Sequence, residues 1–256
     1  MKIDINNIIA ISKQASQAIL EVYNSTDFNI EQKDDKSPLT MADKKSHEII
    51  FQGLQDLYPE IPIISEEGKD IPYEERKKWD TFLLVDPLDG TKEFIKRNDE
   101  FTVNIALIEN NKPVLGVIHV PVSNETYYGS TENGAFKIDS DGEVNKISVS
   151  SKSFDEEINV VQSRSHSGEE ENEFYSNYKI SERLSKGSSL KICLVAEGKA
   201  ELYFRGGPTW EWDTAAGHAI LNAAGGIFLN KDKSELLYNK TILKNFGFIA
   251  SSTKFI

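Results

Sequence analysis

The chain has 256 residues, of which 39% are hydrophobic, and a formal net charge of −12 at pH 7. This length and apolar content suit one large domain or two fused lobes with a substantial core. A field of this sign repels polynucleotides and anionic membranes, which argues against nucleic-acid polymers as partners. A small phosphorylated substrate is still compatible with it, because metal ions and a few local cations act at short range.

The single cysteine, Cys193, excludes an intramolecular disulfide and a cysteine-cluster metal site. It stands in an apolar string, so we expect a buried thiol with no reactive role. No run approaches the ~18 apolar residues of a membrane span, and no basic segment leads into an apolar core at the amino terminus. We therefore expect a cytoplasmic protein, with loose attachment to the inner membrane face left open. The oligomeric state is also open, and a homodimer is compatible with the sequence.

The first half of the chain begins with two predicted helices. Apolar residues recur at helical spacing over residues 4 to 23 and again from near Thr40 to about Leu57, with a polar turn or loop from 31 to 36 between them. A short strand is predicted at 61–64. High charge and lost periodicity from 69 to 78 predict a mobile surface loop, which is a candidate lid.

Strands dominate the predictions that follow. A buried strand is expected at 82–85, and an antiparallel meander with strands at 101–108, 113–120, 126–129 and 134–138. A polar segment from 150 to 157 would join a first lobe, residues 1–149, to a second lobe, residues 150–256. Elements expected in the second lobe are strands at 158–162, 201–204 and 226–229 and helices at 189–197 and 212–224. This alternation indicates an α/β lobe.

The segment from Val85 to Thr91 is the most informative part of the sequence. Asp86 and Asp89 follow the apolar strand, Pro87 cannot extend its hydrogen-bond ladder, and Gly90 can adopt φ values closed to other residues. Two close carboxylates repel each other and are costly to desolvate, so a hard cation such as Mg²⁺ is their natural counter-ion. Asp-Pro and Asp-Gly are also ordinary turn chemistry, so this segment alone supports either interpretation.

Further carboxylates stand at the ends of other predicted elements. Glu66 and Glu67 follow the strand at 61–64, and Asp213 begins the helix at 212–224. Each has a simpler explanation, because the glutamates can be solvated loop charges and Asp213 can complement the positive end of its helix. Acids that converge from separate elements are, however, what a site with two or three Mg²⁺ ions needs for phosphate cleavage.

The order of these motifs resembles one family. Ser37-Pro38-Leu39-Thr40-Met41-Ala42-Asp43, then Ser65-Glu66-Glu67, Asp86-Pro87-Leu88-Asp89-Gly90-Thr91 and Trp212-Asp213 with Ala216-Gly217 are similar to the inositol monophosphatase superfamily of Mg²⁺-dependent, typically lithium-sensitive phosphatases. The resemblance spans most of the chain. It implies a layered αβαβα sandwich with two sheets and the active site between two lobes.

Three further motifs resemble the bacterial CysQ type of 3′(2′),5′-bisphosphate nucleotidase within this superfamily. They are Thr91-Lys92-Glu93-Phe94, Ser163-Arg164-Ser165-His166 and Gly187-Ser188-Ser189-Leu190-Lys191. This resemblance implies hydrolysis of the 3′-phosphate of adenosine 3′,5′-bisphosphate to AMP and phosphate, a reaction of sulfur assimilation.

The resemblance also assigns roles to individual residues. The implied metal ligands are Glu66, Asp86, the backbone carbonyl of Leu88, Asp89 and Asp213, with Asp86 bridging two ions. The implied pair that activates the attacking water is Thr91 and Asp43. The implied substrate contacts are Glu66, Asp89, Gly90, Thr91, His166, Ser188, Lys191, Arg205 and Asp213.

Several of these residues have a second interpretation. With Thr40 three residues earlier, Asp43 forms a capping-box pattern, and both roles coexist only if one carboxylate oxygen stays free. Lys191 and Arg205 can neutralise the uncleaved 5′-phosphate, although a solvated face explains them equally well on sequence alone. His166 can likewise be a structural histidine.

Two alternatives to a nucleotidase are considered. The nearest is another phosphatase of the same fold that acts on an inositol phosphate or a sugar bisphosphate. Inositol-selective relatives tend to carry a glutamate seven residues before the Trp-Asp aspartate, and this chain has Gly206 there, which argues against inositol. The other alternative is a non-catalytic sensor of Mg²⁺ and nucleotide, against which the intact pair of Thr91 and Asp43 speaks.

Overall fold

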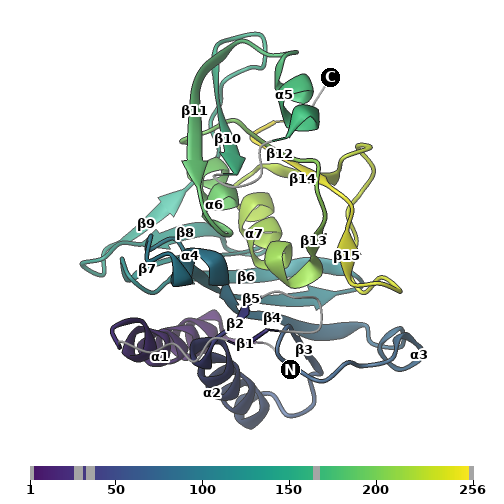
Figure 1. Ribbon diagram of the computed structural model, residues 1–256. Coiled ribbons are helices and arrows are strands. Elements are labelled where there is room, and N and C mark those ends of the chain that lie inside the picture. Colours follow the sequence, from purple (N-terminus) through teal and green to yellow (C-terminus); the bar gives the residue numbers. More distant parts are fainter. Residues whose placement is uncertain (1–2, 26–30, 33–37, 164–167, 254–256) are drawn as a thin grey trace.

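In a computed structural model, which describes residues 3–25, 31–32, 38–163 and 168–253, the chain is built in layers (Figure 1). A pair of helices covers one face of a seven-stranded sheet, and a second pair separates this sheet from a five-stranded one. A further helix lies on the far side of the five-stranded sheet. The predicted αβαβα sandwich with two sheets is therefore confirmed.

The helices are α1 (Ile5–Tyr23), α2 (Met41–Leu57), α3 (Tyr73–Arg76), α4 (Thr91–Ile95), α5 (Glu169–Tyr175), α6 (Leu190–Ala196) and α7 (Glu211–Ala223). The seven-stranded sheet contains, in spatial order, β3 (Ile63–Ser65), β4 (Thr81–Asp89), β5 (Thr102–Glu109), β6 (Lys112–Val120), β7 (Glu125–Ser130), β8 (Gly134–Ile138) and β9 (Val144–Ile147). The five-stranded sheet contains, in spatial order, β11 (Ile180–Lys186), β10 (Ile158–Ser163), β12 (Leu202–Arg205), β16 (Phe248–Ser251) and β14 (Ile227–Asn230). Two short antiparallel pairs are β1 (Glu31–Gln32) with β2 (Pro38–Leu39) and β13 (Thr209–Trp210) with β15 (Lys244–Asn245).

The outer helix pair forms where apolar periodicity and capping agree. Asp4 precedes α1 and accepts the Asn6 N–H at 2.9 Å, while Ile8 and Ile19 on its inner face are fully buried. Thr40 begins α2 through a capping box with Asp43. Both predicted helices are confirmed within a residue or two of their expected ends.

The meander from β5 to β8 is confirmed, and β9 extends it by one strand that was not predicted. Asn110, Asn111 and Asn124 in its turns have φ values of 50°, 63° and 55°. Asparagine tolerates this left-handed region better than most residues, which explains its place between the strands.

Helix α7, from the second half of the chain, packs on the sheet of the first half. Gly116 on β6 allows this approach, because a Cβ atom there would lie 2.3 Å from the Ala216 carbonyl oxygen. Helices α6 and α7 thus form the middle layer between the two sheets (Figure 1). The first residues of both helices lie near the end of β4, because the Ser189 hydroxyl contacts Asp89 and the carbonyl of Asp213.

The structure corrects three predictions about local structure. Glu31–Gln32 pairs with β2, so the expected loop is wrong for these two residues, and residues 33–36 lie outside the described residues. Strand β4 continues through Pro87 to Asp89 and does not end at Val85. It can do so because its register against β5 shifts between Asp86 and Asp89, and a proline is tolerated at such an irregularity.

The third correction concerns residues 69–78, which do not form a mobile loop. They include α3, and the Arg76 side chain is only 4% exposed. Its guanidinium donates to Asn239 Oδ1 at 2.8 Å, Lys240 O at 2.6 Å and Thr241 O at 2.8 Å. Charge-assisted bonds of this kind hold the segment against the second half of the chain, so it is not a lid.

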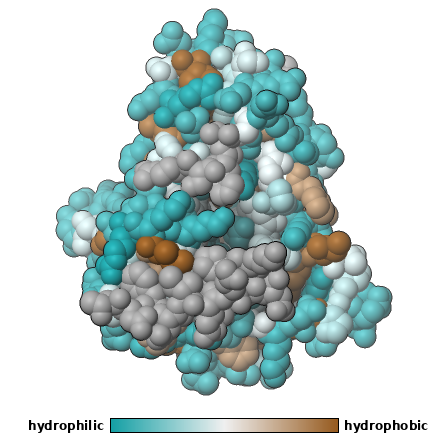
Figure 2. Space-filling view, in the orientation of Figure 1, coloured by the Kyte–Doolittle hydropathy of each residue, from teal (hydrophilic) through white to brown (hydrophobic). Residues whose placement is uncertain are grey.

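The second half contains every helix and strand that was predicted there, together with α5, β11, β13, β15 and β16, which were not. Cys193 is buried, as expected. No helix in the described part of the chain has the length and apolar character needed to cross a membrane. The face shown in Figure 2 is mostly hydrophilic, and its apolar residues lie in small separate groups.

Candidate active site

Parallel pairing of β3 with β4 brings the first two acids together. Ser65 lies opposite Val85, and the N–H of Glu66 donates to the carbonyl of Val85 at 3.1 Å. Glu66 therefore lies beside Asp86 where both strands turn away from their ladder. The Asp86 side chain is 1% exposed, and its Oδ1 accepts the Leu88 N–H at 3.1 Å.

Asp86 lies in a strongly unfavourable environment for a charged carboxylate. Burial raises the pKa of its carboxyl well above the ordinary value of 3.8, and the charge of Glu66 is the next largest cause. The charges of Asp89 and Asp213 raise this pKa further. The four acids therefore act on one another electrostatically, and burial together with the neighbouring acids accounts for the largest effects on the pKa of Asp86.

Asp213 approaches from the first turn of α7. Its Oδ2 accepts the Trp210 N–H at 2.9 Å, so it caps its own helix as the simpler interpretation of the sequence suggested. Burial of its carboxyl also raises its pKa well above 3.8, and the charges of Asp89 and Glu66 add to this effect. Capping and proximity to the other acids therefore coexist at Asp213.

Asp89, at the end of β4, is held by two serines that precede α6. Its Oδ2 accepts the Ser188 hydroxyl at 2.6 Å, the Ser189 N–H at 2.7 Å and the Ser189 hydroxyl at 2.6 Å. Ser188 has a φ of 53°, a left-handed conformation that turns both residues toward Asp89. The structure thus joins the end of β4 to the start of α6.

Asp43 divides its two oxygens between the two predicted roles. Oδ2 accepts the Thr40 N–H at 2.8 Å and the Thr40 hydroxyl at 2.6 Å, which completes the capping box. Oδ1 accepts the Thr91 hydroxyl at 3.3 Å. Thr91 follows Gly90, whose φ of 93° lets the chain turn from β4 into α4. One carboxylate can therefore cap α2 and orient the Thr91 hydroxyl together.

A cavity of about 150 Å³ lies beside the acids. Its lining includes Asp89, Gly90 and Asp213 together with the predicted cationic residues Lys191 and Arg205. Lys191 is 9% exposed and donates to the Ser188 carbonyl at 2.6 Å. Burial lowers its pKa to about 8, so the ammonium is still charged near pH 7. The cavity thus combines acids with fixed positive charge, an arrangement suited to a phosphate ester that also contacts metal.

The acids fit a divalent cation by their chemistry. Oxygen donors suit Mg²⁺, and the buried carboxylates of Asp86 and Asp213 are each made less stable as anions by their neighbours. As they stand, no three acidic, histidine or cysteine side chains among the described residues form a group compact enough to hold an ion.

The sequence singled out two further positions, the predicted substrate residue His166 and Gly206, where inositol-selective relatives tend to carry a glutamate. His166 lies outside the described residues. Gly206 points elsewhere, because a Cβ atom there would lie 2.3 Å from Glu170 Oε2 on α5. The lining of the cavity does not include Gly206, so in this structure a side chain at 206 would face α5.

Sequence reasoning missed the polar residues behind Asp89. Thr102 and Asn104 on β5 are almost completely buried and contact Ser188 and Ser189, respectively. Their signal was present, since two polar residues at alternate positions interrupt an otherwise apolar strand and therefore face the same side.

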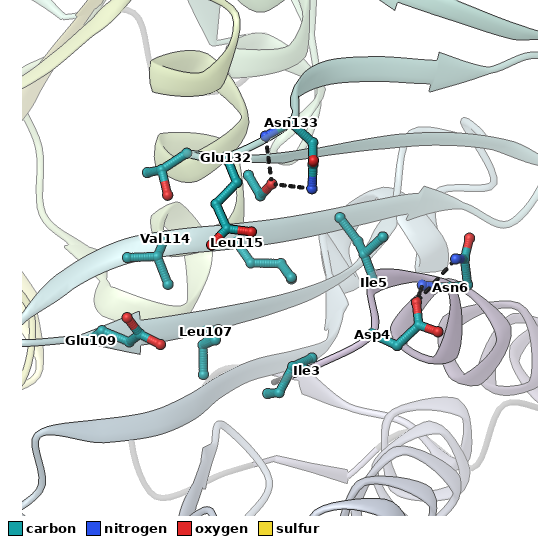
Figure 3. Close-up of a pocket in the computed structure, with 12 residues that line it drawn as sticks. Ile3, Asp4, Ile5, Asn6, Leu107, Glu109, Val114, Leu115, Glu132 and Asn133 are labelled. Atoms are coloured by element: carbon teal, nitrogen blue, oxygen red, sulfur yellow. Dashed lines mark hydrogen bonds between the residues drawn. The ribbon is translucent and has the colours of Figure 1, made fainter. Parts of the chain in front are cut away.

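A larger cavity, of about 520 Å³, lies away from these acids, at the start of α1 (Figure 3). Asp4, Glu109 and Glu132 stand around apolar side chains that include Ile3 and Leu115. None of the predicted site residues lines it. Size alone therefore does not locate the functional site in this protein.

Comparison with known families gives a match over nearly the whole chain. The model of the inositol monophosphatase family matches residues 4–255. The chain belongs to the inositol monophosphatase family. Members of this family are in general metal-dependent phosphatases, which agrees with the acids found at the ends of β3, β4 and α7.

Relatives within the inositol monophosphatase family share a more specific name. The chain is 48% identical over 222 residues to the 3′(2′),5′-bisphosphate nucleotidase CysQ of Salmonella typhimurium, covering 86% of this chain and 88% of the relative. It is 42% identical over 252 residues to the protein of the same name from Buchnera aphidicola, covering 97% and 93%. The crystal structure of CysQ from Bacteroides thetaiotaomicron matches with a TM-score of 0.83 and 42% identity, covering 97% of this chain and 98% of that one.

Proposed function

We propose that this chain is a Mg²⁺-dependent phosphatase that hydrolyses the 3′-phosphate of adenosine 3′,5′-bisphosphate to AMP and phosphate. One observation carries the proposal: a hydroxyl and a carboxylate, Thr91 and Asp43, contact each other beside a set of mutually repelling acids. The 48% identity to a named 3′(2′),5′-bisphosphate nucleotidase supports this choice of substrate.

The metal ligands in this proposal are Glu66, Asp86, Asp89 and Asp213, with the carbonyl of Leu88. Bound Mg²⁺ would supply charge neutralisation for the phosphoryl oxygens and a lower pKa for a bound water. We propose that two or three Mg²⁺ ions bind to these ligands. The chain's own contribution is to bury Asp86 and to hold the other three acids close enough to repel it, so that the site favours a cation.

Thr91 and Asp43 orient the water in this proposal. Thr91 Oγ1 donates its proton to Asp43 Oδ1, which leaves the Oγ1 lone pairs to accept a hydrogen bond from the attacking water. Asp43 Oδ2 stays with the Thr40 cap. Because the cap fixes the rotation of the Asp43 side chain, Oδ1 keeps its direction toward Thr91.

The second phosphate of the substrate is assigned to Lys191 and Arg205. Both line the cavity that Asp89 and Asp213 also line. The Arg205 Nε is a buried donor without a hydrogen-bond partner among the described residues, and a buried unpaired donor is costly unless a ligand fills the place. An anionic group supplies the acceptor that Arg205 Nε lacks and a further acceptor for the Lys191 ammonium.

A phosphate-release panel tests this function. We expect the purified protein with Mg²⁺ to release phosphate from adenosine 3′,5′-bisphosphate much faster than from inositol 1-phosphate or fructose 1,6-bisphosphate, and to release none after chelation of the metal. Faster release from either sugar substrate would replace the nucleotidase proposal with the alternative phosphatase. Calorimetric binding of nucleotide without phosphate release would establish the non-catalytic sensor.

Replacing Lys191 by methionine is expected to weaken the binding of a substrate that has two phosphates. A hydrogen bond to a charged group contributes about 1.5–3 kcal/mol, so KM for adenosine 3′,5′-bisphosphate should rise about 10- to 100-fold. The substrate 3′-AMP, which lacks the 5′-phosphate, is the matched control and should show little change. Similar losses on both substrates would contradict the assignment of Lys191 to the second phosphate.

The same variant should be more stable than the wild type near neutral pH. Burial lowers the pKa of Lys191 to about 8 from 10.5, so the charged lysine lowers the free energy of unfolding by up to about 3 kcal/mol. The unfolded chain binds more protons between these two pKa values, and the stability of the wild type should therefore rise with pH in that window. Denaturant unfolding at pH 7 and pH 10 should show this rise in the wild type and not in Lys191→Met.

A further inference from the structure

Ser189 joins two of the acids that come from opposite parts of the fold. Its hydroxyl oxygen lies 2.6 Å from Asp89 Oδ2 and 3.0 Å from the Asp213 carbonyl oxygen. Asp89 ends β4 in the seven-stranded sheet, whereas Asp213 lies in the first turn of α7. Ser189 itself is 3% exposed. A single buried hydroxyl thus contacts both elements.

This hydroxyl is not used to cap its own helix. Ser189 occupies the N-cap position of α6, where serine ordinarily accepts a backbone N–H of the first turn, yet its side chain makes no such bond. Its donor and acceptor capacity is directed toward Asp89, Asp213 and Asn104 instead. A purely local structural role therefore does not account for its orientation.

Asn104 holds the Ser189 hydroxyl in place by a hydrogen bond. Asn104 belongs to β5, is 1% exposed and lies opposite Asp86 of β4. Its Nδ2 donates to Ser189 Oγ at 2.8 Å and is 3.3 Å from Asp89 Oδ2. The opposite amide orientation would place Oδ1 against the Asp89 carboxylate, so the charge on Asp89 determines which way the amide points.

The hydroxyl has one proton, and its destination follows from these contacts. Because Asn104 donates to Ser189 Oγ, the serine proton goes to Asp89 Oδ2 or to the Asp213 carbonyl. The carboxylate is charged and nearer, so it receives the proton. Asp89 Oδ2 is then held by donors from Ser188, Ser189 and Asn104, and Oδ1 is the oxygen left to face a ligand.

We propose that Ser189 and Asn104 are positioning residues that hold Asp89 in the orientation needed for metal binding and set its distance from Asp213. This inference rests on the proposed function, since it concerns how the proposed metal ligands are arranged. Groups that hydrogen-bond to ligating side chains typically change metal affinity by about 10- to 100-fold when removed.

Calorimetric titration of the metal-free protein with MgCl₂ tests the proposal without relying on turnover. We expect the Mg²⁺ dissociation constant to rise about 10- to 100-fold in Ser189→Ala and in Asn104→Ala. The double variant should bind little more weakly than the weaker single variant, because both residues act on the same carboxylate. The matched control is Ser12→Ala, which removes an equally buried hydroxyl that donates to the Ile9 carbonyl at 2.9 Å far from the site.

Thermal unfolding without Mg²⁺ checks that each variant is folded, and Ser189→Cys, which keeps the size of the side chain, replaces Ser189→Ala if the latter is not. Wild-type Mg²⁺ affinity in folded Ser189 and Asn104 variants would overturn the positioning role. If the wild type itself neither bound Mg²⁺ nor released phosphate, the proposed function would fail first, so the two failures are distinguishable.

Discussion

Asp86→Asn is expected to abolish Mg²⁺-dependent phosphate release and to make the metal-free protein more stable. Asp86 is the most buried of the four acids and is repelled by the other three. Loss of its charge removes one of the carboxylates that would hold Mg²⁺. A metal ion contributes several kcal/mol to transition-state stabilisation, so the rate should fall by at least about 10³-fold.

The stability gain has a defined dependence on pH. The pKa of Asp86 in the folded protein is raised above 3.8, so the folded protein binds more protons than the unfolded chain once the pH exceeds that value. The metal-free wild type therefore loses stability as the pH rises toward the folded-state pKa, and asparagine removes this loss. The stability difference between variant and wild type should be small near pH 4 and larger at pH 7.

Two measurements check this expectation. Denaturant unfolding in chelator at pH 4 and pH 7 gives the stability difference, and calorimetry with MgCl₂ gives the affinity. Asp56→Asn is the matched control, because it removes the same charge from an exposed position on α2. An Asp86→Asn protein that bound Mg²⁺ as tightly as the wild type would show that Asp86 is not a ligand.

Local patterns were sufficient for several of the helices and strands. The capping box of Thr40 and Asp43 depends on residues three apart, and the asparagine turns between strands depend on one or two residues. Strands with long apolar runs between asparagine turns, such as β5 and β6, were therefore predicted close to their observed bounds. In contrast, β11 is polar along most of its length, because it lies at the edge of its sheet and buries little.

Long-range contacts could not be predicted from the sequence patterns. Arg76 is anchored by backbone carbonyls more than 160 positions away, and nothing in the charged segment around it indicates this burial. The same holds for Ser189 and Asp89, which are 100 positions apart and hydrogen-bonded. Such pairs depend on how the sheets are stacked, which periodicity does not encode.

In the candidate site, too, some features follow from local sequence patterns and others depend on long-range contacts. Spacing alone could place Asp86 and Asp89 at the end of a strand, but only the family resemblance distinguished Glu66 from Glu67 and assigned Asp213 as a metal ligand. The structure adds the physical reason for their proximity, which is the parallel pairing of β3 with β4 and the packing of α7 against the first sheet. The roles of these residues in catalysis stay predictions for the variants described here.

Thr91→Val and Asp43→Asn are expected to reduce turnover about 10²- to 10⁴-fold, the usual contribution of general acid–base assistance, while leaving Mg²⁺ affinity unchanged. Valine keeps the shape of Thr91 without its hydroxyl. In Asp43→Asn the remaining oxygen still accepts from Thr40, whose backbone N–H is a fixed donor. The amide nitrogen then faces Thr91 and cannot accept its proton.

Thr40→Ala separates the two roles of Asp43. It removes the side chain that completes the cap but leaves the contact between Asp43 Oδ1 and Thr91. We expect a loss of about 1 kcal/mol in the free energy of unfolding, as for other N-cap replacements, with less than a tenfold change in rate.

The double variant Thr91→Val/Asp43→Asn should be no slower than the slower single variant, because the pair acts as a unit. Single-turnover kinetics at saturating Mg²⁺ measure these rates, and independent, multiplicative losses would mean that the hydroxyl and the carboxylate serve different steps.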